Sequence, residues 1–174
     1  IDYVAVRDVT DDSRPIYVMA KARLPHIFKK EDQYEVVAEF KGDKLKGTTY
    51  EPIFPYFADQ KANGAFVVLN DGYVTTDDGV GLVHIAPAYG EDDFRVCKEA
   101  GITAFADPLD DACAFTDAIP EYAGRFCKDC DKDIIKRLKA EGKLVHQATI
   151  VHSYPFCDRT DTPLIYRAID AWYV

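Results

Sequence analysis

Short β-forming runs separated by turn residues dominate the first half of this chain. Residues 3–6, 15–20 and 34–40 are rich in β-branched and aromatic side chains, which is typical of strands. The polar residues 11–14 between the first two runs indicate a hairpin connection. Many short strands with only a few helices predict a mainly β domain, and they favour closure of the sheet into a barrel.

Similar patterns continue along the chain. Strands are predicted at residues 65–69, 73–76, 82–85, 144–154 and 164–166. Helices are predicted at residues 24–30, 91–100 and 131–141, the last with an apolar stripe of Ile134, Ile135 and Leu138, a cap at Asp131 and a stop at Gly142. With 174 residues, the chain is long enough for one domain, residues 1–174, and we expect both of its ends to be cut from a longer protein.

The net charge and the cysteine content limit the classes of protein to which this chain could belong. A net charge of -9 argues against a freestanding nucleic-acid binder, because phosphate contacts need clustered lysine and arginine. No apolar run approaches membrane-spanning length. Five cysteines without a dense framework suggest a reducing, cytosolic setting.

Residues 75–100 concentrate the groups that could do chemistry. Turn residues 78–81 lead into an apolar run, 82–85, in which His84 is the one polar side chain. Gly90 then permits a sharp entry into a helix, with Glu91, Asp92 and Asp93 in its first turn and Phe94, Cys97 and Ala100 predicted on its buried face. The simpler interpretation is that the acidic residues only complement the helix dipole.

Four metal-binding side chains form a second, looser pattern. Cys127 and Cys130 make a C-x-x-C pair, and His152 and Cys157 follow downstream. Together they would suffice for a tetrahedral zinc site. Their separation is loose, however, and Cys130 directly precedes a predicted helix, so ordinary packing roles are favoured and no metal site is predicted.

Four stretches of the sequence resemble one known family. Residues 79–93 resemble the signature of the editing domain of isoleucyl-tRNA synthetase, a large insertion (the connective polypeptide) in the catalytic core of a class I synthetase. Residues 42–47 with 50–57, residues 131–135, and residues 152–157 with 162–166 agree with it in the family's order. The last of these favours the cytosolic eukaryotic type of the isoleucyl enzyme. The resemblance covers nearly the whole chain and implies a closed β-barrel.

The resemblance also implies an activity, namely hydrolysis of the ester that joins a wrongly attached valine to the isoleucine tRNA. Asp93 matches the family's aspartate, which holds the α-ammonium of the aminoacyl group, and His84 matches the histidine that limits side-chain size. The other residues implied to bind the substrate are Gly79, Val80, Gly81, Ile85, Ala86, Tyr89 and Gly90. The implied partners are the aminoacylated 3' end of the tRNA and the rest of the synthetase. No cofactor is implied for editing, because ATP and magnesium serve the synthetase elsewhere.

The chain also departs from the family. Val80 stands where threonine is usual, and Asp158 where tryptophan is usual. The family's threonine-rich strand lies upstream of the residue that matches Ile1, so part of the active site could be absent. Three alternatives therefore stay open, namely a noncatalytic structural or interaction module, a zinc-stabilised binding domain, and the editing domain of the related valyl or leucyl enzyme. Asp92 competes with Asp93 for the carboxylate role.

Overall fold

The computed structural model describes residues 1–149 and 151–172, which separate into two compact units. The first unit contains Ile1–Tyr50 and Phe66–Ile85, and the second contains Glu51–Ala65 and the chain from Ala86 onward. The prediction of a single domain over residues 1–174 stays a prediction. None of the helices in the described parts of the chain is long and apolar enough to cross a membrane.

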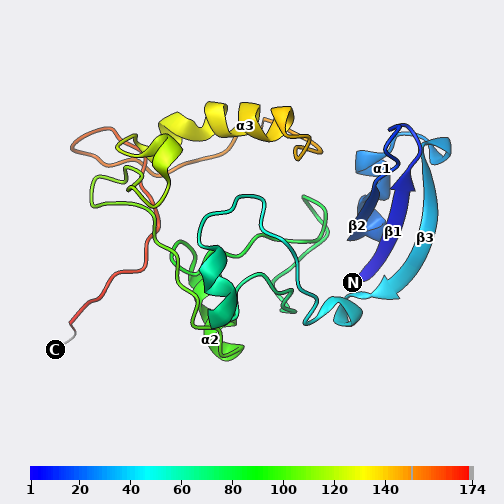
Figure 1. The fold of residues 1–174 in the computed structure, drawn as a ribbon, viewed down its shortest axis with the longest axis horizontal. Coiled ribbons are helices and arrows are strands. Elements are labelled where there is room, and N and C mark those ends of the chain that lie inside the picture. The colour runs from blue at the N-terminus through cyan, green and yellow to red at the C-terminus, as the bar shows by residue number, and fades with distance from the viewer. Residues whose placement is uncertain (150, 173–174) are drawn as a thin grey trace. The chain divides into compact units, whose positions relative to one another are not determined.

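A three-stranded antiparallel sheet forms the framework of the first unit (Figure 1). The strands β1 (Asp2–Asp8), β2 (Ile16–Ala20) and β3 (Tyr34–Lys41) lie in the order β2-β1-β3. All three match the predicted runs. The hairpin between β1 and β2 closes where the Arg14 N–H donates to the Asp11 carbonyl at 2.9 Å.

The core of this unit lies on one face of the sheet. Alternation along β1 puts Val4 and Val6 on the same side, and both are fully buried. They pack with Met19 from β2 and with Leu24 and Phe28 around the short helix α1 (Leu24–Ile27). A helix within residues 24–30 is therefore confirmed, although it is shorter than predicted.

The sheet does not close into a barrel. Within the described residues no further strand pairs along β2 or β3, and residues 65–69, 73–76, 82–85 and 164–166 form no strands. Residues 144–149 and 151–154 are also irregular, while Ile150 lies outside the described residues. Isolated bridges, such as Thr49–Val67, replace continuous strand pairing at residues 65–69. An apolar run becomes a strand only when a neighbour pairs with its backbone, which local sequence cannot specify.

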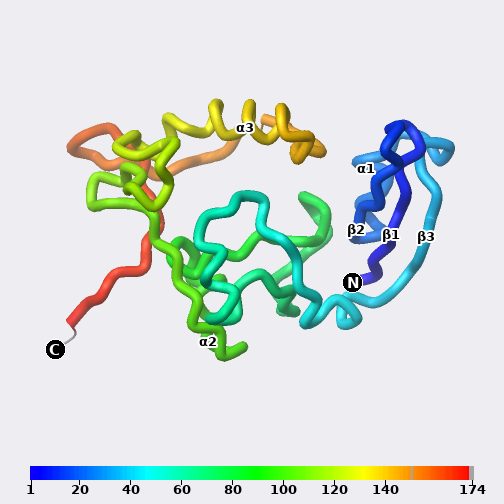
Figure 2. Tube along the Cα trace, viewed as in Figure 1, coloured from blue at the N-terminus to red at the C-terminus, as the bar shows by residue number. Residues whose placement is uncertain are grey.

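Helices and turns, rather than strands, build the second unit (Figure 2). The helices are α2 (Glu91–Glu99) and α3 (Asp131–Ala140), both close to their predicted bounds. Short 3-10 helices cover Ala58–Asn63, Pro120–Tyr122 and Cys127–Cys130 here, and Lys21–Arg23, Glu31–Gln33 and Gly42–Leu45 in the first unit. Gly142 follows the end of α3 with φ +67°, as predicted, but the N-cap is Cys130 rather than Asp131.

The second unit has a small core of its own. Ile119, Tyr122 and the fully buried Cys130 form it, and Ile134 from α3 packs against it. The segment before Ala58 is held to α3 by Arg137, which donates to the Tyr56 hydroxyl at 2.9 Å. Long irregular segments surround this small core. Hydrogen bonds between loops therefore help to hold these segments in place.

Candidate functional site

Asp93 turns back from the first turn of α2 toward the loop that precedes the helix. Its Oδ2 atom accepts a hydrogen bond from the Ala86 N–H at 3.0 Å, and the residue is half-buried. Gly90, the N-cap of α2, makes room for this carboxylate. A Cβ atom at position 90 would lie 2.7 Å from Oδ2 and 2.9 Å from Cγ of Asp93. The position of the Asp93 side chain therefore depends on the absence of a side chain at Gly90.

The neighbouring acidic residues have a different environment. Glu91 and Asp92 are exposed, and Asp92 forms an ion pair with Arg95 at 3.2 Å, one turn later. Exposed pairs of this kind contribute little to stability. The simpler interpretation, complementing the helix dipole, fits Glu91 and Asp92, whereas Asp93 contacts a separate loop.

The buried face of α2 differs from the prediction. Val96 and Cys97 are buried, while Phe94 is 45% exposed and Ala100 is also exposed. Asp93, Val96 and Cys97 share one face because residues three and four apart lie together on a helix. The contact of Asp93 with the loop orients that face inward. Burial, and then the nearby Asp93 carboxylate, raises the pKa of the Cys97 thiol, which disfavours a reactive thiolate.

The loop formed by residues 86–89 is a tight turn. The Tyr89 N–H donates to the Ala86 carbonyl at 2.8 Å, with Pro87 at a position that its fixed φ suits. Ala88 is fully buried, and its carbonyl accepts a hydrogen bond from the Ala168 N–H at 2.8 Å. A segment eighty positions further along the sequence therefore helps to hold this loop.

Tyr89 begins a polar network that sequence reasoning missed. Its hydroxyl donates to Oδ1 of Asp107 at 2.6 Å, and Oδ2 of Asp107 accepts from Nε of Arg167 at 2.9 Å. Burial, followed by the bond to Asp107, raises the pKa of Tyr89 well above its ordinary value. Partial burial alone would raise the pKa of Asp107, but the hydrogen bonds from Tyr89 and Arg167 outweigh it and lower that pKa. The tyrosine is thus a neutral donor to an ionised carboxylate.

No local signal could have identified this network. Asp107 follows Tyr89 by 18 positions and precedes Arg167 by 60. Residues 103–122 have few periodic features, and from the sequence we expect only loop with short strands there. The three side chains meet because irregular segments fold together, which neither helical nor strand spacing describes.

The predicted residues of the glycine-rich loop lie in the first unit, on one end of the sheet. Gly79 and Gly81 adopt φ values of +60° and +75°, which glycine tolerates without strain. The Gly81 carbonyl accepts from the Tyr3 hydroxyl at 2.6 Å, and the Val80 carbonyl accepts from the Ala20 N–H at 2.8 Å. This loop is therefore firmly attached to the β-sheet.

His84 does not lie on a strand. It is exposed within an irregular segment, where Val83 is 53% exposed. The predicted strand at residues 82–85 is therefore wrong. His84 and Ile85 belong to the first unit, as do residues 79–81, whereas Ala86, Tyr89, Gly90 and Asp93 belong to the second. Within the second unit the structure brings those four residues together around the start of α2.

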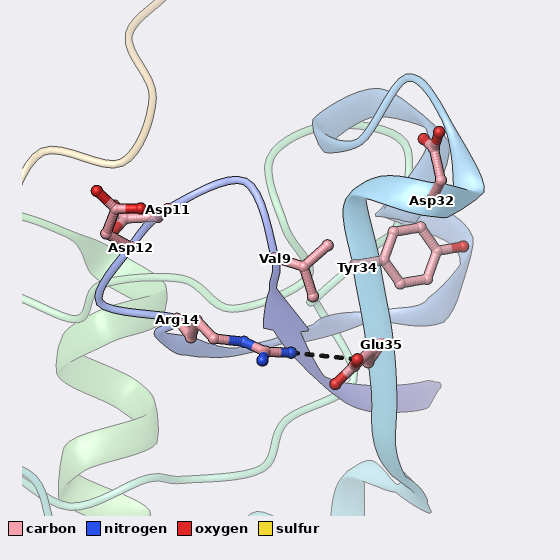
Figure 3. A pocket seen from close by; sticks show the side chains of 7 residues that line it. All are labelled: Val9, Asp11, Asp12, Arg14, Asp32, Tyr34 and Glu35. Atoms are coloured by element: carbon pink, nitrogen blue, oxygen red, sulfur yellow. Dashed lines mark hydrogen bonds and ion pairs between the residues drawn. The ribbon is translucent and has the colours of Figure 1, made fainter.

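Two surface hollows are further candidates for a binding site. The one in the first unit is lined by acidic residues of the hairpin and of β3, with Arg14 paired to Glu35 at 3.1 Å (Figure 3). The carboxylates of Asp11, Asp12 and Asp32 do not converge there. The Asp11 carboxylate already accepts hydrogen bonds from the N–H and the hydroxyl of Ser13. The hollow in the second unit measures about 480 Å³ and has a mainly apolar lining that includes Tyr89 and Leu109.

The cysteines have packing environments. Cys130 is fully buried in the small core of the second unit, and its thiol donates to the Phe126 carbonyl at 3.5 Å. Cys127 is half-buried. Across residues 1–149 and 151–172, no three histidine, cysteine or acidic side chains gather in a way that could hold a metal ion.

We therefore expect elemental analysis of the purified protein to find no stoichiometric zinc. Cys130 packs in the core of the second unit, and burial raises the pKa of the Cys127 thiol, which disfavours the thiolate that a metal requires. The measurement is the zinc content per chain, with the Cys130→Ala variant as the control. One zinc per chain that is lost in this variant would contradict the expectation.

Comparison with known proteins gives one consistent set of relatives. No protein-family model matches the chain. The chain is 49% identical over 175 residues to an isoleucine–tRNA ligase of Bdellovibrio bacteriovorus. It is 43% identical to the cytoplasmic isoleucine–tRNA ligase of Mus musculus and 46% identical to that of Caenorhabditis elegans. These matches cover 99–100% of the chain but only 14–16% of each relative, so the chain corresponds to a small part of such proteins.

Proposed function

Because the chain is homologous along its whole length to a segment of the isoleucine–tRNA ligases, we propose that it is the editing domain of such a ligase. The proposed reaction is hydrolysis of the ester that links a wrongly attached valine to the isoleucine tRNA. The parent protein would be cytoplasmic, as the names of the mouse and worm relatives state for those proteins.

Packing energetics explain why such a reaction is needed. A site built for isoleucine cannot strongly exclude a side chain that is one methylene smaller. That difference is worth only about 1–3 kcal/mol, a general value for which the isoleucine–tRNA ligases are themselves the usual example. A second site can sort in the opposite direction by admitting valine and rejecting isoleucine on size.

The observation that carries the proposal is the position of Asp93. Its carboxylate is half-buried and anchored through one oxygen, Oδ2, on the Ala86 N–H. Among the described residues, its Oδ1 atom receives no hydrogen bond from another side chain. A carboxylate held in this way can bind the α-ammonium of an aminoacyl group through a charge-assisted hydrogen bond. The ester would then lie in a fixed orientation for attack by water.

The proposed mechanism uses a positioned water rather than a protein nucleophile. Cys97 lies one turn after Asp93, but its raised pKa keeps the thiol neutral. Water attacks the ester carbonyl, the bond to the tRNA ribose oxygen breaks, and that oxygen leaves with a proton. Valine and uncharged tRNA are the products. Editing by this route needs no cofactor, and ATP and magnesium would serve aminoacylation elsewhere in the ligase.

The resemblance also predicts a closed barrel, which the three-stranded sheet is too small to form. Closure would require additional strands along β2 and β3. We propose that other parts of the ligase supply them. The matched relatives are more than six times as long as this chain, so they have ample sequence to do so.

A noncatalytic structural module is the alternative. The net charge of -9 and the open sheet favour it for this segment alone. The two functions are separated by following the release of valine from valyl-tRNA by a full-length ligase that carries this segment. Loss of hydrolysis on changing a single carboxylate would favour catalysis, whereas a structural module would tolerate the change.

We expect His84→Ala in the full-length ligase to begin hydrolysing correctly charged isoleucyl-tRNA while still clearing valyl-tRNA. The resemblance assigns His84 a steric role, and truncating an excluding side chain should admit the extra methylene of isoleucine. The measurement is the deacylation rate of both substrates by this one variant. If both rates fell together and the cognate product stayed intact, His84 would be a general base instead.

A further inference from the structure

We propose that Arg167, Asp107 and Tyr89 are positioning residues that hold the loop 86–89 and, through it, the Asp93 carboxylate. This inference rests on the proposed function of Asp93. It adds Asp107 and Arg167, which are distant in sequence and which neither the motifs nor the resemblance assigned, and it gives Tyr89 a positioning role through its hydrogen bond to Asp107. All of them belong to the second unit.

Arg167 is the anchor of this arrangement. Its Nε atom donates to Asp107 at 2.9 Å, Nη2 donates to the Leu109 carbonyl at 2.8 Å, and Nη1 donates to the Asp110 carbonyl at 3.1 Å. The side chains of Arg167 and Asp107 are only 23% and 21% exposed. This pair is therefore less screened by water than the other ion pairs of the described chain. Two nitrogens of Arg167, Nε and Nη2, lie 2.9 and 2.8 Å from Oδ2 of Asp107, which leaves Oδ1 to accept from Tyr89.

Tyr89 connects Asp107 to the loop formed by residues 86–89. Asp107 accepts the Tyr89 hydroxyl at 2.6 Å, while the Tyr89 N–H closes the turn on the Ala86 carbonyl at 2.8 Å. Next to Arg167, the Ala168 N–H binds the carbonyl of the buried Ala88 at 2.8 Å. Residues 167–168 therefore hold the second half of the turn in two ways. Arg167 reaches Tyr89 through Asp107, and Ala168 binds Ala88 directly.

Asp93 depends on the first half of the same turn. The Ala86 N–H is the donor that binds Oδ2 of Asp93. A shift of the turn would move this donor and with it the carboxylate that is proposed to orient the substrate. Because a misplacement of about 1 Å can cost about a hundredfold in rate, a loose loop should slow hydrolysis even when the altered residue is Arg167, which is not among the residues implied to bind the substrate.

The test uses Arg167→Met and Tyr89→Phe in the full-length ligase, with hydrolysis of valyl-tRNA as the readout. We expect each variant to lower kcat by about tenfold to a hundredfold, with a smaller change in KM. Arg159→Met is the matched control, because Arg159 is exposed in a turn of the same terminal segment. The double variant should lose little more than the larger single loss, since both side chains act through Asp107.

A purely structural role would produce a different result. The rate of tRNA isoleucylation and the thermal unfolding midpoint are measured on the same preparations. Arg167→Met could lower the isoleucylation rate and the unfolding midpoint as much as it lowers hydrolysis. In that case Tyr89→Phe would distinguish positioning from a general structural role, because it removes only one hydroxyl. Full hydrolysis by Tyr89→Phe would overturn the positioning inference. Failure of the unaltered ligase to hydrolyse valyl-tRNA would instead overturn the proposed function.

Discussion

Replacing Asp93 with alanine in a full-length ligase that carries this segment is expected to remove nearly all hydrolysis of valyl-tRNA. The carboxylate is the group proposed to pair with the substrate ammonium, and it is half-buried and held by the Ala86 N–H. Loss of one partner of a desolvated charge pair typically costs about 2–5 kcal/mol, which corresponds to a rate loss of about thirtyfold to a few thousandfold. The measurement is single-turnover deacylation of valyl-tRNA.

The adjacent acidic residue is the matched control. Asp92→Ala removes an equal charge from the same helical turn, but Asp92 is exposed and already pairs with Arg95. Its loss should change hydrolysis by less than about threefold, as expected for a screened surface charge. Asp93→Asn keeps the shape of the side chain and should resemble Asp93→Ala. If Asp92→Ala were the more damaging variant, the assignment of the carboxylate would be wrong by one residue.

Local patterns predicted the elements that local interactions determine. The strands β1, β2 and β3, the hairpin at residues 11–14 and the helices α2 and α3 were all recognisable from periodicity and turn residues. The start of α2 at Gly90 was also predicted, but from the sharp entry into the helix that a glycine permits. In the structure Gly90 has an extended backbone, and its role is to make room for the Asp93 carboxylate, which a sequence pattern does not reveal.

Distant contacts explain what the sequence did not predict. Residues 82–85 have the composition of a strand but find no pairing partner among the described residues, so they stay irregular and leave His84 exposed. Spacing alone placed Phe94 on the buried face of α2, whereas the contact of Asp93 with the loop turns the face of Val96 and Cys97 inward. Asp107 and Arg167 could not be found for the same reason, since they meet Tyr89 only in the folded chain.

Gly90→Ala in the full-length ligase is expected to lower valyl-tRNA hydrolysis by about a hundredfold, although it changes no charged or polar side chain. Gly90 has φ -149° and ψ 136°, an extended conformation that alanine also adopts without strain. The added methyl group would, however, lie 2.7 Å from Oδ2 of Asp93. The carboxylate must therefore move, and a displacement of about 1 Å can cost about a hundredfold in rate.

Gly72→Ala is the matched control for this change. Its backbone has no positive φ, and a Cβ atom there would meet no other atom within 4 Å, so hydrolysis should be unaffected. Thermal unfolding provides a second readout. The midpoint should fall in Gly90→Ala and recover when Asp93→Ala is added, because the crowded carboxylate is then absent, while hydrolysis should not recover. Full hydrolysis by Gly90→Ala would mean that the enzyme does not use the Asp93 carboxylate in this position.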